Sequence, residues 1–123
     1  DDVVGMAFRM KDLQSMYVLS IDRYYDTQNP GNGGVSGYHS GLYKIVNGQK
    51  QMLVDLKPIY WPKDKFDHYK IRVEGKTIEI WRNGEKIVDY TDNTNPILEG
   101  AWGPFSISQA YACFKNLSIQ YIR

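Results

Sequence analysis

The sequence predicts an all-β protein, an antiparallel sandwich or barrel, and three observations lead to this prediction. Apolar and polar residues alternate over several short stretches, as they do in half-buried strands. Asn-Gly pairs separate two pairs of these stretches, and Asn-Gly is the preferred sequence of a two-residue hairpin turn. No segment repeats apolar residues at the spacing of an amphipathic helix. Short strands joined by Gly, Asn and Pro turns are typical of sandwiches and barrels.

The clearest signal is a run of three strands in the second half of the chain. From Tyr69 to Glu74, apolar and charged residues alternate strictly. Ile78 and Ile80 continue the apolar face in a second strand. Asn83-Gly84 then supplies the two positive-φ residues of a type I′ turn, which leads into a third strand. Three strands with one apolar face need a second layer to cover that face.

Two strands are predicted ahead of this meander, over residues 3–10 and 16–23. Arg9 lies on the polar side of the first strand, and Asp22 lies outside the core in the favoured reading of the second. The face assignment of the second strand stays open, because both of its alternating sets contain apolar residues. The favoured core set is Tyr17, Leu19 and Ile21, and the competing set includes Met16 and Val18.

Residues 24–38 form a long insertion rich in Gly and Asn that shows no period. A loop of this length inside a compact domain is usually functional or disordered. Further strands are predicted over 41–46 and 51–56, around the second Asn-Gly turn. Two prolines in the loop 57–67 exclude a central strand there. The last two predicted strands cover 105–108 and 113–122.

Length and charge limit what the protein can be. A chain of 123 residues is expected to form one domain, over residues 1–123. With a net charge of +1 and no basic run, we expect no nucleic-acid partner. No apolar run approaches the roughly 20 residues of a membrane-spanning helix, so we expect no membrane insertion. Cys113 is the single cysteine, which excludes an internal disulfide and is typical of a buried thiol.

The order of these elements resembles the concanavalin A-like jelly-roll superfamily, in its laminin-G-like branch. Fructan-binding carbohydrate modules and the thrombospondin C-terminal domain are similar members. The resemblance extends over essentially the whole chain and implies a jelly-roll β-sandwich. It is carried by GMAFRMKD and YVLSIDR, by the meander YKIRVEGKTIEIWRNGEKIVDYTD, and by GAWGPFSIS with ACFKNLSI.

The sequence departs from this pattern in two ways. Members often place a tryptophan just before the meander, where this chain has Asp67-His68. Members also carry further strands ahead of the first one here, and the chain begins at Asp1 without a start methionine. We interpret the chain as a mature or excised segment whose N-terminal strand is missing or borrowed. An open sheet edge attracts pairing, so we expect another polypeptide or a symmetry mate along it.

The sequence does not predict an enzyme. Retaining glucanases on this fold carry E-x-D-x-x-E on one strand, which places two carboxylates on one sheet face. That motif is absent here, and Glu74, Glu79 and Glu85 are separated by turns or placed beside basic residues. We interpret these three as solvated strand charges.

A calcium site is the one metal site that the sequence suggests. The loop after the meander holds Asp92, Asn93 and Asn95, whose side-chain oxygens suit a hard cation, and the resembled family often holds calcium at loops on the sandwich rim. The competing interpretation is a turn, because Asp and Asn also hydrogen-bond their own backbone. We therefore expect no certain cofactor, with Ca²⁺ as the candidate.

Sugar recognition is the ligand chemistry that fits the loops. An aromatic side chain can cover the apolar face of a sugar ring, and polar groups can bond its hydroxyls. Arg9 and Asp22 face outward on adjacent strands if they pair as predicted, where they bond a ligand or each other. Trp81 shares a polar face with Glu79 and is either exposed or covered by another segment. The remaining candidates are Tyr24, Tyr25, Tyr38, His39, Tyr60, Trp61 and Trp102.

These observations together predict a non-catalytic carbohydrate-binding module of a larger secreted or cell-surface protein. Its expected partner is a glycan or polysaccharide, and its expected location is extracellular. The alternative is a protein-binding adhesion or structural domain of laminin-G or thrombospondin type. Both interpretations rest on the resemblance and on the loop aromatics, and fold alone does not decide between them.

Overall fold

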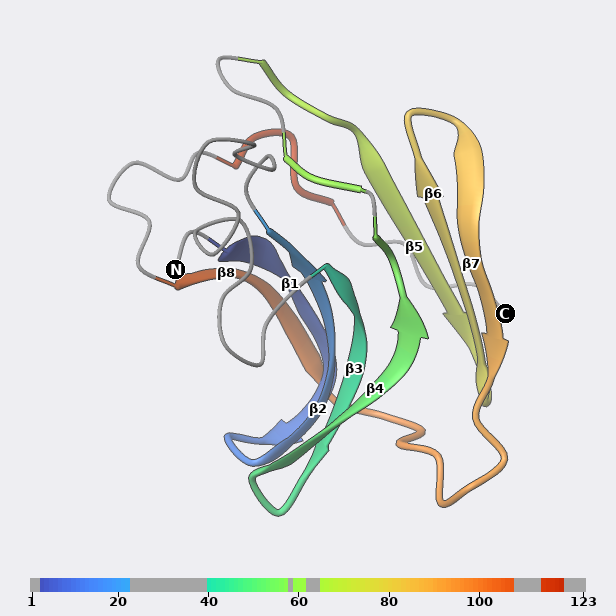
Figure 1. The fold of residues 1–123 in the computed structure, drawn as a ribbon. Coiled ribbons are helices and arrows are strands. Elements are labelled where there is room, and N and C mark those ends of the chain that lie inside the picture. The colour runs from blue at the N-terminus through green and yellow to red at the C-terminus, as the bar shows by residue number, and fades with distance from the viewer. Residues whose placement is uncertain (1–2, 23–39, 58, 62–64, 108–113, 119–123) are drawn as a thin grey trace.

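The computed structural model describes residues 3–22, 40–57, 59–61, 65–107 and 114–118, which form an antiparallel β-sandwich (Figure 1). One sheet has five strands in the order β4-β3-β2-β1-β8, and the other has three in the order β5-β6-β7. The described residues contain no helix, and so none that could cross a membrane. The predicted all-β sandwich is confirmed. The strands are β1 Val3–Asp12, β2 Ser15–Ile21, β3 Gly41–Val46, β4 Gln49–Asp55, β5 Tyr69–Glu74, β6 Thr77–Arg82, β7 Glu85–Thr91 and β8 Ala101–Ile107.

Both predicted Asn-Gly turns are confirmed. Asn47 and Gly48 have φ of 51° and 77°, and they join β3 to β4. Asn83 and Gly84 have φ of 49° and 85°, and they join β6 to β7. Two consecutive positive φ values are what a type I′ hairpin turn requires.

The main core lies between the two sheets. β2 contributes Tyr17, Leu19 and Ile21, as the favoured reading of its alternation predicted. Ile78 and Ile80 of β6 face them from the three-stranded sheet and are almost fully buried. Because side chains alternate along a strand, Lys70, Arg72 and Glu79 lie on the opposite, outer face.

The outer face of the five-stranded sheet is also apolar, which the sequence prediction missed. Val18 and Tyr43 are buried there, and Phe105 packs against them from β8. Asp22 was predicted to lie outside the core, but both Asp22 and its neighbour on the same strand face, Ser20, are 0% exposed. The prediction failed because it treated only one face of β2 as buried.

The edges of the two sheets differ from the predicted ones. β1 lies between β2 and β8, so the first strand of the chain is not an edge strand. The outermost described strands are β4, β8, β5 and β7, and pairing of another polypeptide along any of them stays a prediction. β8 begins at Ala101, before the predicted residue 105, because an outermost strand tolerates Pro104. Of the predicted strand 113–122, residues 114–118 are described and form no strand, and the rest lie outside the described residues.

Candidate functional site

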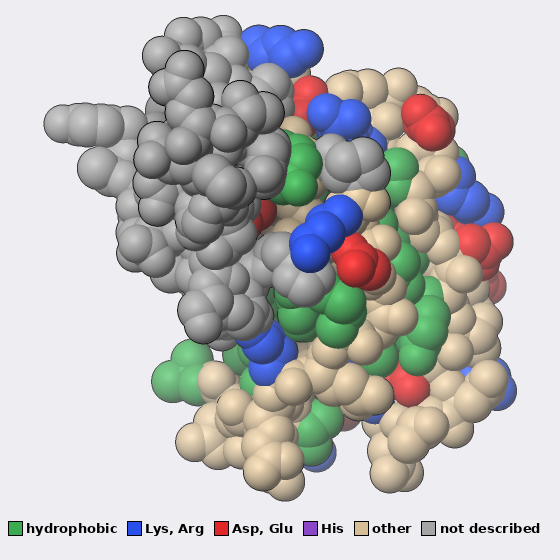
Figure 2. All heavy atoms as spheres, viewed as in Figure 1, with side chains coloured by type: hydrophobic (Ala, Val, Ile, Leu, Met, Phe, Trp, Pro, Cys, Tyr) green, Lys and Arg blue, Asp and Glu red, His purple; other side chains and the backbone are tan. Residues whose placement is uncertain are grey.

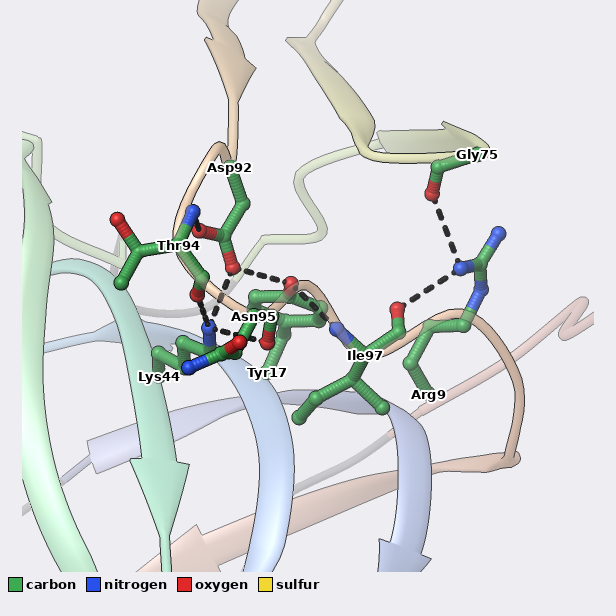
Figure 3. Close-up of polar contacts among 8 residues, drawn as sticks. All are labelled: Arg9, Tyr17, Lys44, Gly75, Asp92, Thr94, Asn95 and Ile97. Carbon is green, nitrogen blue, oxygen red and sulfur yellow. Dashed lines mark hydrogen bonds and ion pairs between the residues drawn. The ribbon is translucent and has the colours of Figure 1, made fainter.

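A buried ion pair lies at the end of the sandwich where the chain leaves β7. The Lys44 ammonium donates to Oδ2 of Asp92 at 2.6 Å, and the two side chains are 6% and 3% exposed. The Tyr17 hydroxyl donates to the same carboxylate oxygen, also at 2.6 Å. The pair therefore joins β3 and β2 of one sheet to the segment that follows the other (Figure 3).

Backbone groups complete this network and close the loop. Lys44 also donates to the carbonyl oxygens of Thr94 at 2.6 Å and Asn95 at 2.9 Å. The Thr94 amide donates to the second Asp92 oxygen at 3.0 Å, and the Ile97 amide donates to the Tyr17 hydroxyl at 3.0 Å. All three Lys44 protons thus have acceptors, which offsets the cost of burying the ammonium.

The network shifts the pKa values of its acids. Burial alone would raise the pKa of Asp92, but the hydrogen bonds from Lys44, Tyr17 and the Thr94 amide hold it below its ordinary value. Burial, followed by the hydrogen bond to Asp92, raises the pKa of Tyr17 to about 12. The carboxylate is therefore ionised and the phenol neutral at pH 7.

The calcium prediction at this loop stays untested by any bound ion, and the residues present do not fit it. Both Asp92 oxygens accept hydrogen bonds, and a charged ammonium lies where a cation would have to enter. The side-chain oxygen of Asn93 accepts from Lys76 at 2.8 Å, and Asn95 uses its backbone oxygen for Lys44. Among the described residues, no three His, Cys, Asp or Glu side chains gather as a metal site.

Arg9 is not placed as predicted. Its guanidinium Nη1 donates to the carbonyl oxygens of Ile97 at 2.9 Å and Gly75 at 3.1 Å, so it links the two sheets instead of facing outward (Figure 3). Arg9 has a φ of 50°, within the irregular stretch where the β1 pairing shifts register. A bulge redirects side chains in this way.

Arg9 and Asp22 are also too far apart to act as a pair. Asp22 follows Ile21, which pairs with Val4 near the start of β1, whereas Arg9 follows the Phe8–Tyr17 pair. The two residues therefore lie at opposite ends of the antiparallel pair. This placement does not test whether Arg9 or Asp22 contacts a ligand.

A second group of polar residues gathers at the Asp22 end of the sandwich. The Asp22 amide donates to the Ser40 hydroxyl at 2.9 Å, and the Trp61 amide donates to the Asp22 carbonyl at 2.9 Å. Ser20 lies beside them, opposite Gly41, and its buried hydroxyl has no hydrogen-bond partner in the described part of the chain. Tyr60 is half-buried next to Trp61. We call Ser20, Asp22, Ser40, Tyr60 and Trp61 the Asp22 cluster.

Three of the predicted site residues, Asp22, Tyr60 and Trp61, belong to the Asp22 cluster, and the others do not. Trp61 is half-buried and contacts the main core. Trp102 also packs against the main core, but from the far end of β8, where Ala101 pairs with Met10. Four further candidates, Tyr24, Tyr25, Tyr38 and His39, lie outside the described residues.

The outer face of the three-stranded sheet carries charged side chains around Trp81. The Trp81 ring lies between the ammonium groups of Lys70 at 5.0 Å and Lys86 at 5.3 Å from its centre. Lys86 also pairs with Glu79 and Asp89. Figure 2 shows acidic and basic side chains close together along the side of the molecule formed by β6 and β7. This face is charged and internally paired.

Sequence reasoning missed Lys44 and Ser40. Lys44 could have been found, because it shares a strand face with the buried Leu42, and a charge on a core face implies a buried partner. Ser40 gives no such signal, since its role depends on where the chain returns after residues 23–39.

Comparisons with known proteins agree with a sandwich fold of this kind. Among solved structures, the chain is similar to the carbohydrate-binding module CBM66 from Bacillus subtilis, with a TM-score of 0.57 and 20% identity over 85% of this chain and 55% of that one. At this identity the likeness shows the fold, and it confirms the predicted jelly-roll sandwich. It does not support the finer placement in the laminin-G-like branch.

The sequence itself places the chain in a family. The model of the 3-keto-alpha-glucoside-1,2-lyase-like domain matches residues 4–120, and the chain belongs to this family. The chain covers just over half of the similar solved structure. Comparison with curated protein sequences gave no match.

Proposed function

We propose that this domain binds carbohydrate as a non-catalytic module of a larger extracellular protein, with the Asp22 cluster as its site. The observation that carries the proposal is the hydrogen bond between the Trp61 amide and the Asp22 carbonyl, which places the backbone of a half-buried tryptophan beside buried polar residues. An aromatic side chain next to fixed polar groups is the usual chemistry of sugar recognition.

The comparisons support this choice of ligand class. The family description names an α-glucoside, and the similar solved structure is titled a carbohydrate-binding module. Glucose units joined by α-linkages are therefore the first ligands to test. No observation in the described residues favours the alternative of a protein-binding adhesion domain.

Titration calorimetry with an α-linked glucose tetrasaccharide tests the proposal. We expect saturable binding by the wild type and a loss of about tenfold or more in affinity for Trp61→Ala, because a stacked aromatic ring is removed. Trp81→Ala is the matched control, since Trp81 is also half-buried but lies on the outer face of the other sheet. Absence of binding by the wild type, or equal binding by both variants, contradicts the proposal.

A second candidate function is catalysis, and the family description favours it. A ketone at C3 of a glucoside acidifies the hydrogen on C2, so that a base can remove this proton while the bond from C1 to the leaving oxygen breaks. In the part of the chain that the structure describes, Glu74 pairs with Arg72, and Glu79 and Asp89 pair with Lys86. These acids are therefore poor candidates for the base.

Incubation with a 3-keto α-glucoside separates the two functions. A binding module leaves the compound intact over hours, as followed by proton NMR. Turnover that persists in a highly purified sample would replace the non-catalytic proposal with the lyase reaction.

A further inference from the structure

A pocket of about 310 Å³ opens on the β3–β4 hairpin, away from the Asp22 cluster. Lys44 pairs with Gln51 and Val46 pairs with Gln49 across the two strands, so these four side chains share one face. Lys44 pairs with Tyr17 of the main core, so this face is the one that points into the sandwich. The full lining is Lys44, Val46, Asn47, Gln49, Lys50 and Gln51.

The pocket is open because the second sheet does not extend over this part of the hairpin. Figure 1 shows β3 and β4 curving away from the three-stranded sheet toward their turn. Gln49 and Gln51 are consequently exposed, and Val46 keeps 43% of its surface exposed although it continues the core face. A pocket of about this volume is at the lower limit for small-molecule sites.

The chemistry of the lining favours a neutral, hydroxyl-rich ligand. Each glutamine amide offers two N–H donors and one oxygen acceptor in a plane, which matches the paired hydroxyls of a sugar. Val46 offers an apolar contact for the ring face. Of the two lysines in the lining, Lys44 is paired with Asp92 and the Lys50 ammonium lies over the Tyr43 ring, so neither ammonium is positioned to select an anion in the pocket.

We propose that this pocket is a second carbohydrate subsite, in which Gln49 and Gln51 bond sugar hydroxyls and Val46 contacts the sugar ring. This inference rests on the proposed function and extends it. Along β3, Ser40 lies four residues from Lys44 and six from Val46, which is roughly 13–20 Å at about 3.3 Å per residue. One short sugar cannot fill both places, so the domain holds a glycan polymer at two points, which raises its avidity.

The direct test is NMR of the folded domain during titration with an α-linked glucose tetrasaccharide. Side-chain amide signals report Gln49 and Gln51, and the indole N–H signal reports Trp61. We expect saturable shifts in all three. Shifts of Trp61 alone overturn the second subsite and leave the proposed function standing. Shifts of the glutamines alone support the pocket and remove the Asp22 cluster as the site. No shift in any signal overturns the proposed function together with this inference.

A variant pair tests the polymer contact. Gln49→Ala combined with Gln51→Ala removes both amides from exposed positions, where folding is little affected. We expect roughly tenfold weaker retention by soluble starch in affinity electrophoresis, because one of two contact points is lost. Glu85→Ala is the control, since Glu85 follows Asn83-Gly84 as Gln49 follows Asn47-Gly48. Equal retention of the double variant and the control would overturn the second subsite.

Discussion

Lys44 is the residue on which the loop after β7 depends. A lysine in a buried strand position is costly unless every proton finds an acceptor, and here the acceptors are Asp92 and the carbonyl oxygens of Thr94 and Asn95. Oxygen acceptors arranged around a positive charge resemble a small cation site in which the cation belongs to the protein. These hydrogen bonds hold the loop after β7 against β3.

Replacing Lys44 with methionine tests this role. The side-chain volume is nearly kept, but Asp92 retains a buried charge without its partner, which typically costs roughly 3–5 kcal/mol. We expect a fall of that size in the free energy of unfolding, measured by urea denaturation. Lys11→Met is the control, because Lys11 is exposed at the end of β1. A loss no greater than that of the control would show that Lys44 does not stabilise the loop.

The same network predicts how stability depends on pH. The pKa of Asp92 is depressed in the folded state, so its stabilising effect is present above the ordinary value of 3.8 and is lost as the pH falls through the folded value. The pKa of Tyr17 is raised from 10.0 to about 12, so its effect is complete below pH 10 and is lost as the pH rises toward 12. The pKa of Tyr69 is raised to about 12 as well, by burial.

The alkaline limb can be assigned by substitution. Between pH 10 and pH 12 the wild type should lose roughly 2–3 kcal/mol through Tyr17. Tyr17→Phe should be less stable at pH 7, since Asp92 and Ile97 lose a hydrogen bond, but its stability should fall less over the same alkaline range. Denaturation curves of both proteins, measured by fluorescence between pH 10 and pH 12, show whether Tyr17 accounts for the alkaline loss of stability. Parallel curves for the two proteins would assign the loss to other groups.

Among the connecting elements, two glycines with positive φ are predicted to differ sharply. Gly84 has a φ of 85°, and an added Cβ would meet open space there, so Gly84→Ala should cost only the backbone strain of about 1–2 kcal/mol. Gly100 has a φ of 148°, and an added Cβ would lie 2.5 Å from the Arg9 carbonyl carbon. Gly100→Ala should therefore cost roughly 3–5 kcal/mol. Thermal unfolding of both variants checks the order, and equal losses would contradict this packing.

The hairpins are the elements that could be predicted from the sequence. The Asn-Gly pairs at 47–48 and 83–84 predict type I′ turns. The alternation of apolar and polar residues in the flanking strands predicts which face of each strand is buried. The predicted start of β8, residue 105, lies after the observed start at Ala101. Pro104 argues against a strand unless that strand is known to be outermost in its sheet. Local sequence carries turn geometry, whereas the position of a strand in a sheet depends on segments far away in the chain.

The candidate site was harder to predict because it is assembled across the whole molecule. Sequence reasoning chose Asp22 and Trp61 separately, and the structure joins them through one backbone hydrogen bond. It paired Arg9 with Asp22, which the register of β1 with β2 places at opposite ends. Residue type suggests which side chains suit a ligand, but only register and loop paths decide which of them meet.

The charge of the whole molecule gives a last prediction, about how binding responds to salt. The net charge is +1, and the charged face of the three-stranded sheet is internally paired, so no long-range field draws an anionic ligand. Affinity for a neutral α-linked tetrasaccharide should change by less than about twofold between low and high ionic strength. Calorimetry at several salt concentrations measures this. A steep fall with salt would instead show that charged side chains hold the tetrasaccharide, with Lys70 and Lys86 beside Trp81 as the candidates, and Trp81→Ala would then be the variant that loses binding.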